Sequence, residues 1–228
     1  MVAIGHHQVE ILSPYSYQIL FYGDQVRLVG QMDFPPSPPK ARGHKLFFTL
    51  QHATHTHTKE YDCYVSVARE KGYASFRWDK RGTGRSGSGG LGNPMQDAVN
   101  AYQVAVRRTG INPEQVVIFA QNEGSLILGK NLERFMAIQK PKAIILAGNM
   151  LDQTLIEQIE CPLYIMQGEQ DWLNGQEYAL KASRYHQEKQ GYPGNAKIIQ
   201  QADRHLMADN QQRHPLALET LASWLGEI

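Results

Sequence analysis

The sequence predicts an α/β fold, with a mostly parallel sheet covered by helices on both faces. Two observations predict it. Near the start, two strand-like segments are separated by Gly23 and Asp24, residues that favour a hairpin turn. After them, short apolar segments alternate with longer helix-like segments, which is the pattern of repeated β–loop–α units. The 228 residues allow one large domain or two small ones.

The first elements form the antiparallel part of the expected sheet. Residues 15–22 and 25–32 alternate or run apolar, and we expect them to pair as the hairpin. The proline-rich segment 34–39 then reads as a long turn between strands. Residues 46–50 form a short, dense apolar run, which is typical of a strand buried on both faces.

The next elements begin the β–loop–α alternation. Residues 60–71 have a helical pattern that ends at Gly72, a natural C-terminal stop. A strand is expected at 73–78, followed by a glycine-rich loop over 79–93. Residues 94–109 carry small apolar side chains on one face, as an amphipathic helix does.

The remaining elements continue this alternation to the end of the chain. Strands are expected at 116–120, 143–147, 162–167 and 196–199. Helices are expected at 123–138, 176–190 and 216–225, with one helical turn near 155–159. The order predicts a mostly parallel sheet that follows an antiparallel hairpin.

Composition excludes several classes of function. Lys and Arg total 23 against 22 Asp and Glu, so the net charge of +1 gives no basic footprint for nucleic acid or an anionic membrane surface. No apolar run approaches the length of a membrane-spanning helix, and the first residues, which include His6, His7 and Glu10, contain no signal-peptide apolar region. Cys63 and Cys161 cannot build a disulfide framework. We therefore expect a cytoplasmic protein whose partner is a small-molecule substrate or ligand.

In such a sheet, ligands bind beyond the carboxyl ends of the strands. The most informative of these loops reads Ala120-Gln121-Asn122-Glu123-Gly124, at a tight turn from a strand into a helix. It resembles the nucleophile elbow, Gly-x-Ser-x-Gly, of the α/β-hydrolase superfamily.

Four further segments resemble motifs of the same superfamily, in the same chain order. Asp171, after the strand expected at 162–167, matches the acidic triad member, and His205 matches the triad histidine. Residues 78–86 resemble the family's Asp-x-Arg-Gly-x-Gly-x-Ser turn, and His52-Ala53 stands in the place of its His-Gly loop. The resemblance implies an esterase-like hydrolase fold in one domain over residues 1–228, without a cap. The connection of about 15 residues before the strand at 162–167 is too short for a separate lid.

The sequence departs from the family at the elbow, where Asn122 stands in the place of the serine. Asn tolerates the positive φ of this turn, so the turn can persist. A carboxamide has no proton whose removal gives a useful nucleophile, so covalent triad hydrolysis is not expected. Ser125 is no substitute, since it lies three residues further on, in the first turn of the helix.

The other parts implied by the resemblance are present. Asp171 and His205 would form an acid–histidine pair. Backbone N–H groups of Glu123 and of Ala53 or Thr54 would line an oxyanion hole.

Beside these groups, we expect His52 and Gln121 at a substrate pocket. Its walls would come from the segments 52–58, 84–94 and 148–160.

Three functions remain open at this point. His205, oriented by Asp171, could act as general base on water or on a substrate. The chain could be a non-catalytic binding protein of esterase or acyl-hydrolase ancestry. It could also be an active serine hydrolase inactivated by a Ser-to-Asn exchange at position 122.

Other signals have simpler explanations. His52, His55 and His57 are spaced as metal ligands can be, but no carboxylate or cysteine lies among them, and we expect no metal there. The segment 82–92 lacks the Gly-Lys-Ser/Thr of a phosphate loop, and no motif predicts a cofactor. Asp79 and Arg81 are expected to pin this loop, and Cys63 to be a core residue.

Overall fold

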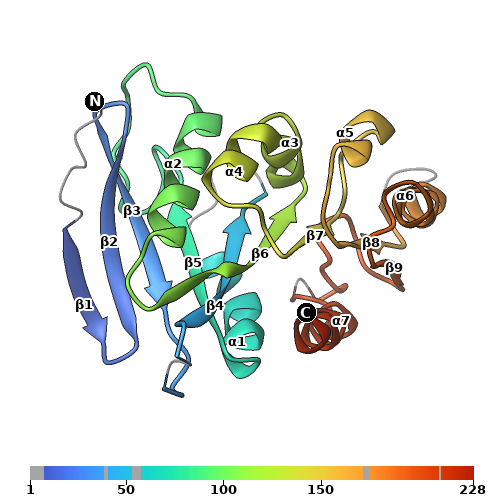
Figure 1. Ribbon diagram of the computed structural model, residues 1–228, viewed down its shortest axis with the longest axis horizontal. Helices are drawn as coiled ribbons and strands as arrows, with labels where there is room; N and C mark the ends of the chain where they lie inside the picture. Colours follow the sequence, from blue (N-terminus) through green and yellow to red (C-terminus); the bar gives the residue numbers. More distant parts are fainter. Residues whose placement is uncertain (1–7, 39–40, 53–57, 172–174, 211) are drawn as a thin grey trace.

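The computed structural model describes most of the chain (Figure 1). The described residues are 8–38, 41–52, 58–171, 175–210 and 212–228. Within them, a nine-stranded sheet has the strand order β1-β2-β3-β5-β4-β6-β7-β8-β9. The strands are Val9–Ser13 (β1), Ser16–Gly23 (β2), Val26–Asp33 (β3), His44–Leu50 (β4), Tyr73–Asp79 (β5), Ile111–Gln121 (β6), Ala143–Ala147 (β7), Leu163–Gly168 (β8) and Gly194–Ile199 (β9).

The first strands pair antiparallel, β1 with β2, β2 with β3 and β3 with β5. From β5 to β9 all neighbouring strands are parallel. The predicted mostly parallel α/β fold with an N-terminal hairpin is therefore confirmed. β4 lies between β5 and β6, so the chain reverses its direction of progress across the sheet at this point. In open α/β sheets, such a switch point is where ligands bind.

Helices cover both faces of the sheet (Figure 1). One face carries α2 to α6, whose apolar side chains join one core cluster, and the other carries α1 and α7, which join a second. The helical segments are Thr58–Tyr61 (η1), Asp62–Glu70 (α1), Pro94–Val106 (α2), Glu123–Gly129 (α3), Leu132–Ile138 (α4), Gln153–Glu157 (α5), Gly175–Gln190 (α6) and Pro215–Glu227 (α7). No helix among the described residues is long and apolar enough to cross a lipid bilayer.

The structure differs from the expected elements in three places. The hairpin turns at Asp24 and Gln25, both with positive φ, because Gly23 still pairs with Val26 in the ladder. The helix expected at 123–138 is two helices, because the Asn131 side chain donates to Ile127 O and ends the first.

The third difference is β1, which was not expected. All five of its residues are exposed, so the segment lacks the one-sided apolar alternation by which a half-buried strand is found.

Candidate functional site

Asn122 forms a sharp elbow between β6 and α3. Its φ of 47° and ψ of −116° are those of the first central residue of a type II′ turn, a conformation that costs about 1–3 kcal/mol for a residue with a side chain. Its N–H donates to Ala147 O at 3.0 Å, and its carbonyl accepts from Ser125 N at 2.8 Å. The Ser125 hydroxyl also donates to this carbonyl, at 2.6 Å. Ser125 is thus a buried support of the elbow rather than a free hydroxyl.

The Asn122 side chain points toward the loop that carries His205. Asn122 Nδ2 lies 3.2 Å from His205 Nδ1, and the residue is only 2% exposed. Its Oδ1 is buried and accepts no hydrogen bond from the described residues. A Cβ on Gly148 would lie 2.6 Å from this Oδ1 and 2.4 Å from Arg204 O. Only glycine at position 148 therefore lets the elbow and the His205 loop approach this closely.

The loop between β9 and α7 positions His205. Asp203 Oδ1 accepts from the backbone N–H groups of His205 and Met207, at 2.8 Å each. Leu206 has a φ of 59°, so this turn is tight. A Cβ on Gly168, at the end of β8, would lie 2.0 Å from Asp203 O. The loop is therefore packed directly against the strand ends.

Gln121 joins three parts of the site. Its Oε1 accepts from the Tyr61 hydroxyl at 2.9 Å, and its Nε2 donates to His205 O at 2.9 Å. The Tyr61 hydroxyl in turn accepts from the His52 N–H at 2.7 Å. Gln121 was expected at a substrate pocket, but it is fully buried, with both ends of its amide bound to protein. Its place in the structure is that of a support for the loops.

Asp171 lies in the turn after β8, as expected, and its side chain is buried. The carboxylate accepts a hydrogen bond from Gln167 Nε2 and lies 3.9 Å from Arg204 Nε. In a Ser-His-Asp triad the histidine Nδ1 faces the acid. Here that nitrogen of His205 faces Asn122. The role of Asp171 as the partner of His205 stays a prediction.

The oxyanion residues are only partly described. Glu123 is the first residue of α3, directly after the elbow, while Ala53, Thr54, His55 and His57 lie outside the described residues. Lys80 Nζ donates to Gln51 O at 3.0 Å and to His52 O at 2.6 Å. It thereby fixes the end of β4, and burial lowers the pKa of this amine to about 8.

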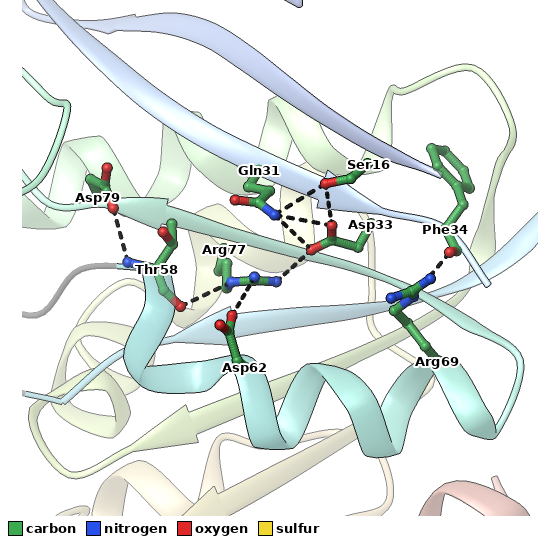
Figure 2. Close-up of polar contacts among 9 residues, drawn as sticks. All are labelled: Ser16, Gln31, Asp33, Phe34, Thr58, Asp62, Arg69, Arg77 and Asp79. Carbon is green, nitrogen blue, oxygen red and sulfur yellow. Dashed lines mark hydrogen bonds and ion pairs between the residues drawn. The ribbon is translucent and has the colours of Figure 1, made fainter. Parts of the chain in front are cut away.

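A buried ion-pair network fixes the start of η1 (Figure 2). Arg77, on β5, binds Asp33 Oδ2 at 2.5 Å, Asp62 Oδ1 at 2.6 Å and Thr58 O at 2.9 Å. The Thr58 N–H donates to Asp79 Oδ1 at 2.9 Å. Both backbone groups of Thr58 are therefore anchored to the sheet. The Asp79 carboxylate also accepts from the Arg85 N–H at 2.9 Å, as expected for a residue that pins its loop.

Arg81 pins the glycine-rich loop, as predicted. It binds both carboxylate oxygens of Asp97, at 2.8 and 3.0 Å, and the carbonyls of Gly23 and Gly89. Within the part of the chain that the structure describes, no cluster of three His, Cys, Asp or Glu side chains is placed to hold a metal ion.

A cavity of about 620 Å³ adjoins His205, on the side of the sheet that carries α1 and α7. Its lining includes His52, Glu60, Cys63, His205, Met207, Arg213 and Leu218. The segments 84–94 and 148–160, expected as pocket walls, do not contribute to it. Cys63, predicted as a core residue, packs against the second core cluster but is only partly buried and also lines this cavity.

His52 and His205 meet at the wall of this cavity, with ring centroids 4.8 Å apart. His52 Nε2 also lies 3.6 Å from Glu60 Oε2. Burial, together with the nearby His205 and Arg213, lowers the pKa of His52 to about 4. His52 is therefore neutral at physiological pH.

Known structures have the same fold. Est1E from Butyrivibrio proteoclasticus, solved with ferulic acid bound, superimposes with a TM-score of 0.67 at 16% identity, covering 91% of this chain and 96% of that chain. An esterase from Pyrococcus furiosus superimposes with a TM-score of 0.67 at 13% identity, covering 97% of this chain and 90% of that chain. A candidate α/β-hydrolase from Agrobacterium tumefaciens superimposes with a TM-score of 0.68 at 15% identity, covering 91% of this chain and 94% of that chain.

The fold is that of the α/β-hydrolases. At these identities the likeness establishes the α/β-hydrolase fold and nothing finer. A scan against models of protein families gave no match, and neither did a search of curated proteins.

Sequence reasoning missed several residues of this site. Tyr61 and Lys80 fix the end of β4, and Arg213 contacts His205 from the loop that precedes α7. Of these residues, Lys80 alone could have been found from the sequence, because it lies within the motif at 78–86. No sequence pattern marks Tyr61 or Arg213, since only the packing of η1 and of the loop before α7 brings them to the site.

Proposed function

We propose that this chain is a non-catalytic ligand-binding protein of esterase or acyl-hydrolase ancestry. In this proposal the elbow, the histidine loop and the oxyanion groups of a hydrolase persist, while Asn122 has taken the place of the nucleophile. The bound molecule is a small one, held without covalent chemistry.

The contact between Asn122 Nδ2 and His205 Nδ1, at 3.2 Å, carries the proposal. An amide NH₂ can only donate, so this contact is a hydrogen bond in the tautomer of His205 that accepts through Nδ1 and carries its proton on Nε2, and we adopt that tautomer. The one lone pair with which a neutral imidazole could take a proton is then bound to Asn122. This arrangement disfavours His205 as a general base on water, and a carboxamide at position 122 supplies no nucleophile.

The strained backbone at the elbow supports the ancestry. Asn122 keeps a positive φ with ψ near −116°, although a binding protein gains nothing obvious from this cost. Glu123 opens α3 in the position from which an N–H would line an oxyanion hole. We assign Asp171, Ala53 and Thr54 to the same inherited site, as acid and oxyanion residues.

Hydrolysis of short-chain aryl esters by the parent protein and by Asn122→Ser tests the proposal. The parent should show no turnover above buffer. Asn122→Ser should gain turnover, because a hydroxyl then stands at the elbow and Nδ1 of His205 is released. Asn122→Ser/His205→Ala should lose that gain, and Asn122→Ala serves as the matched control without a hydroxyl.

Two results would overturn the proposal. Turnover in the parent that disappears in His205→Ala would mean that the histidine acts without a covalent step. A folded Asn122→Ser protein with no turnover would mean that the inherited site is no longer assembled.

A further inference from the structure

Arg213 differs from Arg77 and Arg81 in the partners of its guanidinium. Arg77 and Arg81 each bind a buried carboxylate, Asp33 and Asp97 respectively. Arg213 is partly buried, and no carboxylate among the described residues forms an ion pair with it. The guanidinium stays charged at any accessible pH, and Glu60 is the carboxylate that acts on it through space.

The contacts that Arg213 does make use only part of its guanidinium. Nη1 donates to His205 O. The guanidinium carbon lies 5.2 Å from the centroid of the Tyr64 ring and 5.8 Å from that of Tyr61, so one side of the group packs on aromatic faces. The Cys63 and Tyr64 side chains also lie within hydrogen-bonding reach of the guanidinium. An arginine has five N–H donors, so these contacts do not use all of them.

Arg213 lines the cavity of about 620 Å³ described above. That volume suits a small organic molecule. Met207 and Leu218 give the cavity apolar wall, and the neutral ring of His52 adds no charge to it. The carboxylate in its lining, Glu60, is exposed and lies against His52. The cavity therefore combines the Arg213 cation, on one wall, with an apolar body and with the exposed Glu60 carboxylate.

We propose that this cavity is a binding site for a small carboxylate with an apolar or aromatic body, its anionic group held by Arg213. The planar guanidinium matches the two oxygens of a carboxylate. With Nδ1 of His205 directed at the Asn122 amide, an N–H on Nε2 is a further donor at the same wall. The proposal deepens the ligand-binding function and rests on it, since it names the class of ligand.

A purely structural role for Arg213 is the competing explanation, because its bond to His205 O also holds the loop. The variant Leu218→Trp distinguishes the binding role of Arg213 from the structural role. This change fills the cavity from α7 but leaves Arg213 and its contacts with His205 and the tyrosines in place.

Calorimetric titration of the whole protein with sodium benzoate, near pH 7 and at low salt, tests the proposal. Benzamide is the uncharged control of the same shape. Benzoate should bind at least about tenfold more tightly than benzamide, a difference of about 1.4 kcal/mol. Arg213→Gln should weaken benzoate by about tenfold or more, and Leu218→Trp should abolish binding with an unchanged melting temperature. Arg42→Gln, at an exposed arginine, should have no effect.

Equal binding of benzoate and benzamide would overturn the proposal, as would benzoate binding that Leu218→Trp leaves intact or no benzoate binding up to about 10 mM. Tighter binding of inorganic phosphate than of benzoate would reassign the site to phosphate. If Arg213→Gln fails to fold, benzoate binding by the parent and its loss in Leu218→Trp still test the proposal. Gain of ester turnover in Asn122→Ser without benzoate binding would reject this inference alone. Benzoate binding without that gain would reject the ancestry alone.

Discussion

The side-chain nitrogen of Asn122 lies 3.2 Å from Nδ1 of His205, across the gap between the end of β6 and the loop that precedes α7. In a hydrolase triad the other ring nitrogen, Nε2, faces the residue at the elbow. Here Nδ1 faces the elbow, so the imidazole has the ring orientation opposite to that of a triad histidine. The contact joins the two loops, and in the proposed function it occupies the lone pair that a general base requires.

Gly148→Ala should destabilise the protein and separate these two loops. The added Cβ would lie 2.4 Å from Arg204 O and 2.6 Å from Asn122 Oδ1, at a φ of +63°. We expect a loss of about 2 kcal/mol or more in the free energy of unfolding, measured in urea. Gly72→Ala is the matched control, because it has a φ of +80° with nothing within 4 Å. It should lose only about 1 kcal/mol, and an equal loss in the two variants would contradict the predicted clash.

Arg77→Met should be among the most destabilising single changes. It leaves the buried Asp33 carboxylate without its cation and frees Thr58 O (Figure 2). Removing one partner of a buried ion pair costs about 3–5 kcal/mol. Arg42→Met breaks an exposed pair with Glu114 and should change stability by less than about 1 kcal/mol. Urea unfolding of both variants checks the prediction, which similar losses would refute.

Stability should fall with pH in the acid range, partly through His52. Its pKa is about 4 in the folded protein against an ordinary value of 6.5, so the unfolded chain binds more protons between these values. The free energy of unfolding therefore decreases as pH falls from about 6.5 through about 4. His52→Gln should make this dependence shallower, as urea unfolding at several pH values would reveal. Burial also lowers the pKa values of His44 and His186, so His52→Gln should keep part of the pH dependence of the free energy of unfolding. A pH dependence in His52→Gln that equals that of the parent would argue against a neutral His52 in the folded protein.

Much of the fold could be predicted because its signals are local. Most of the parallel strands are short apolar runs, and each resembled motif follows one of these strands along the chain. The elbow could also be located from the sequence, since Asn is one of the few residues that accept positive φ. Asn122 adopts that conformation.

The parts that could not be predicted depend on contacts between distant segments. Gln121 looked like a pocket residue because it adjoins Asn122, but Tyr61 and His205 O take both ends of its amide. Cys63 packs against the core, but the pattern of one helix does not reveal that this residue also borders a cavity near α7. The ring orientation of His205 depends on a single contact with Asn122, which no spacing in the sequence encodes.

Intact-protein mass after exposure to an alkyl fluorophosphonate tests the central claim most directly, because the reagent marks a hydroxyl activated at a hydrolase elbow. Asn122→Ser should gain the mass of one phosphonyl group and lose that reactivity when His205→Ala is added, while the parent and Asn122→Ala should stay unmodified. Labelling of the parent, or a folded Asn122→Ser protein that remains unlabelled, would contradict the account of an inherited hydrolase site whose nucleophile has been replaced by Asn122.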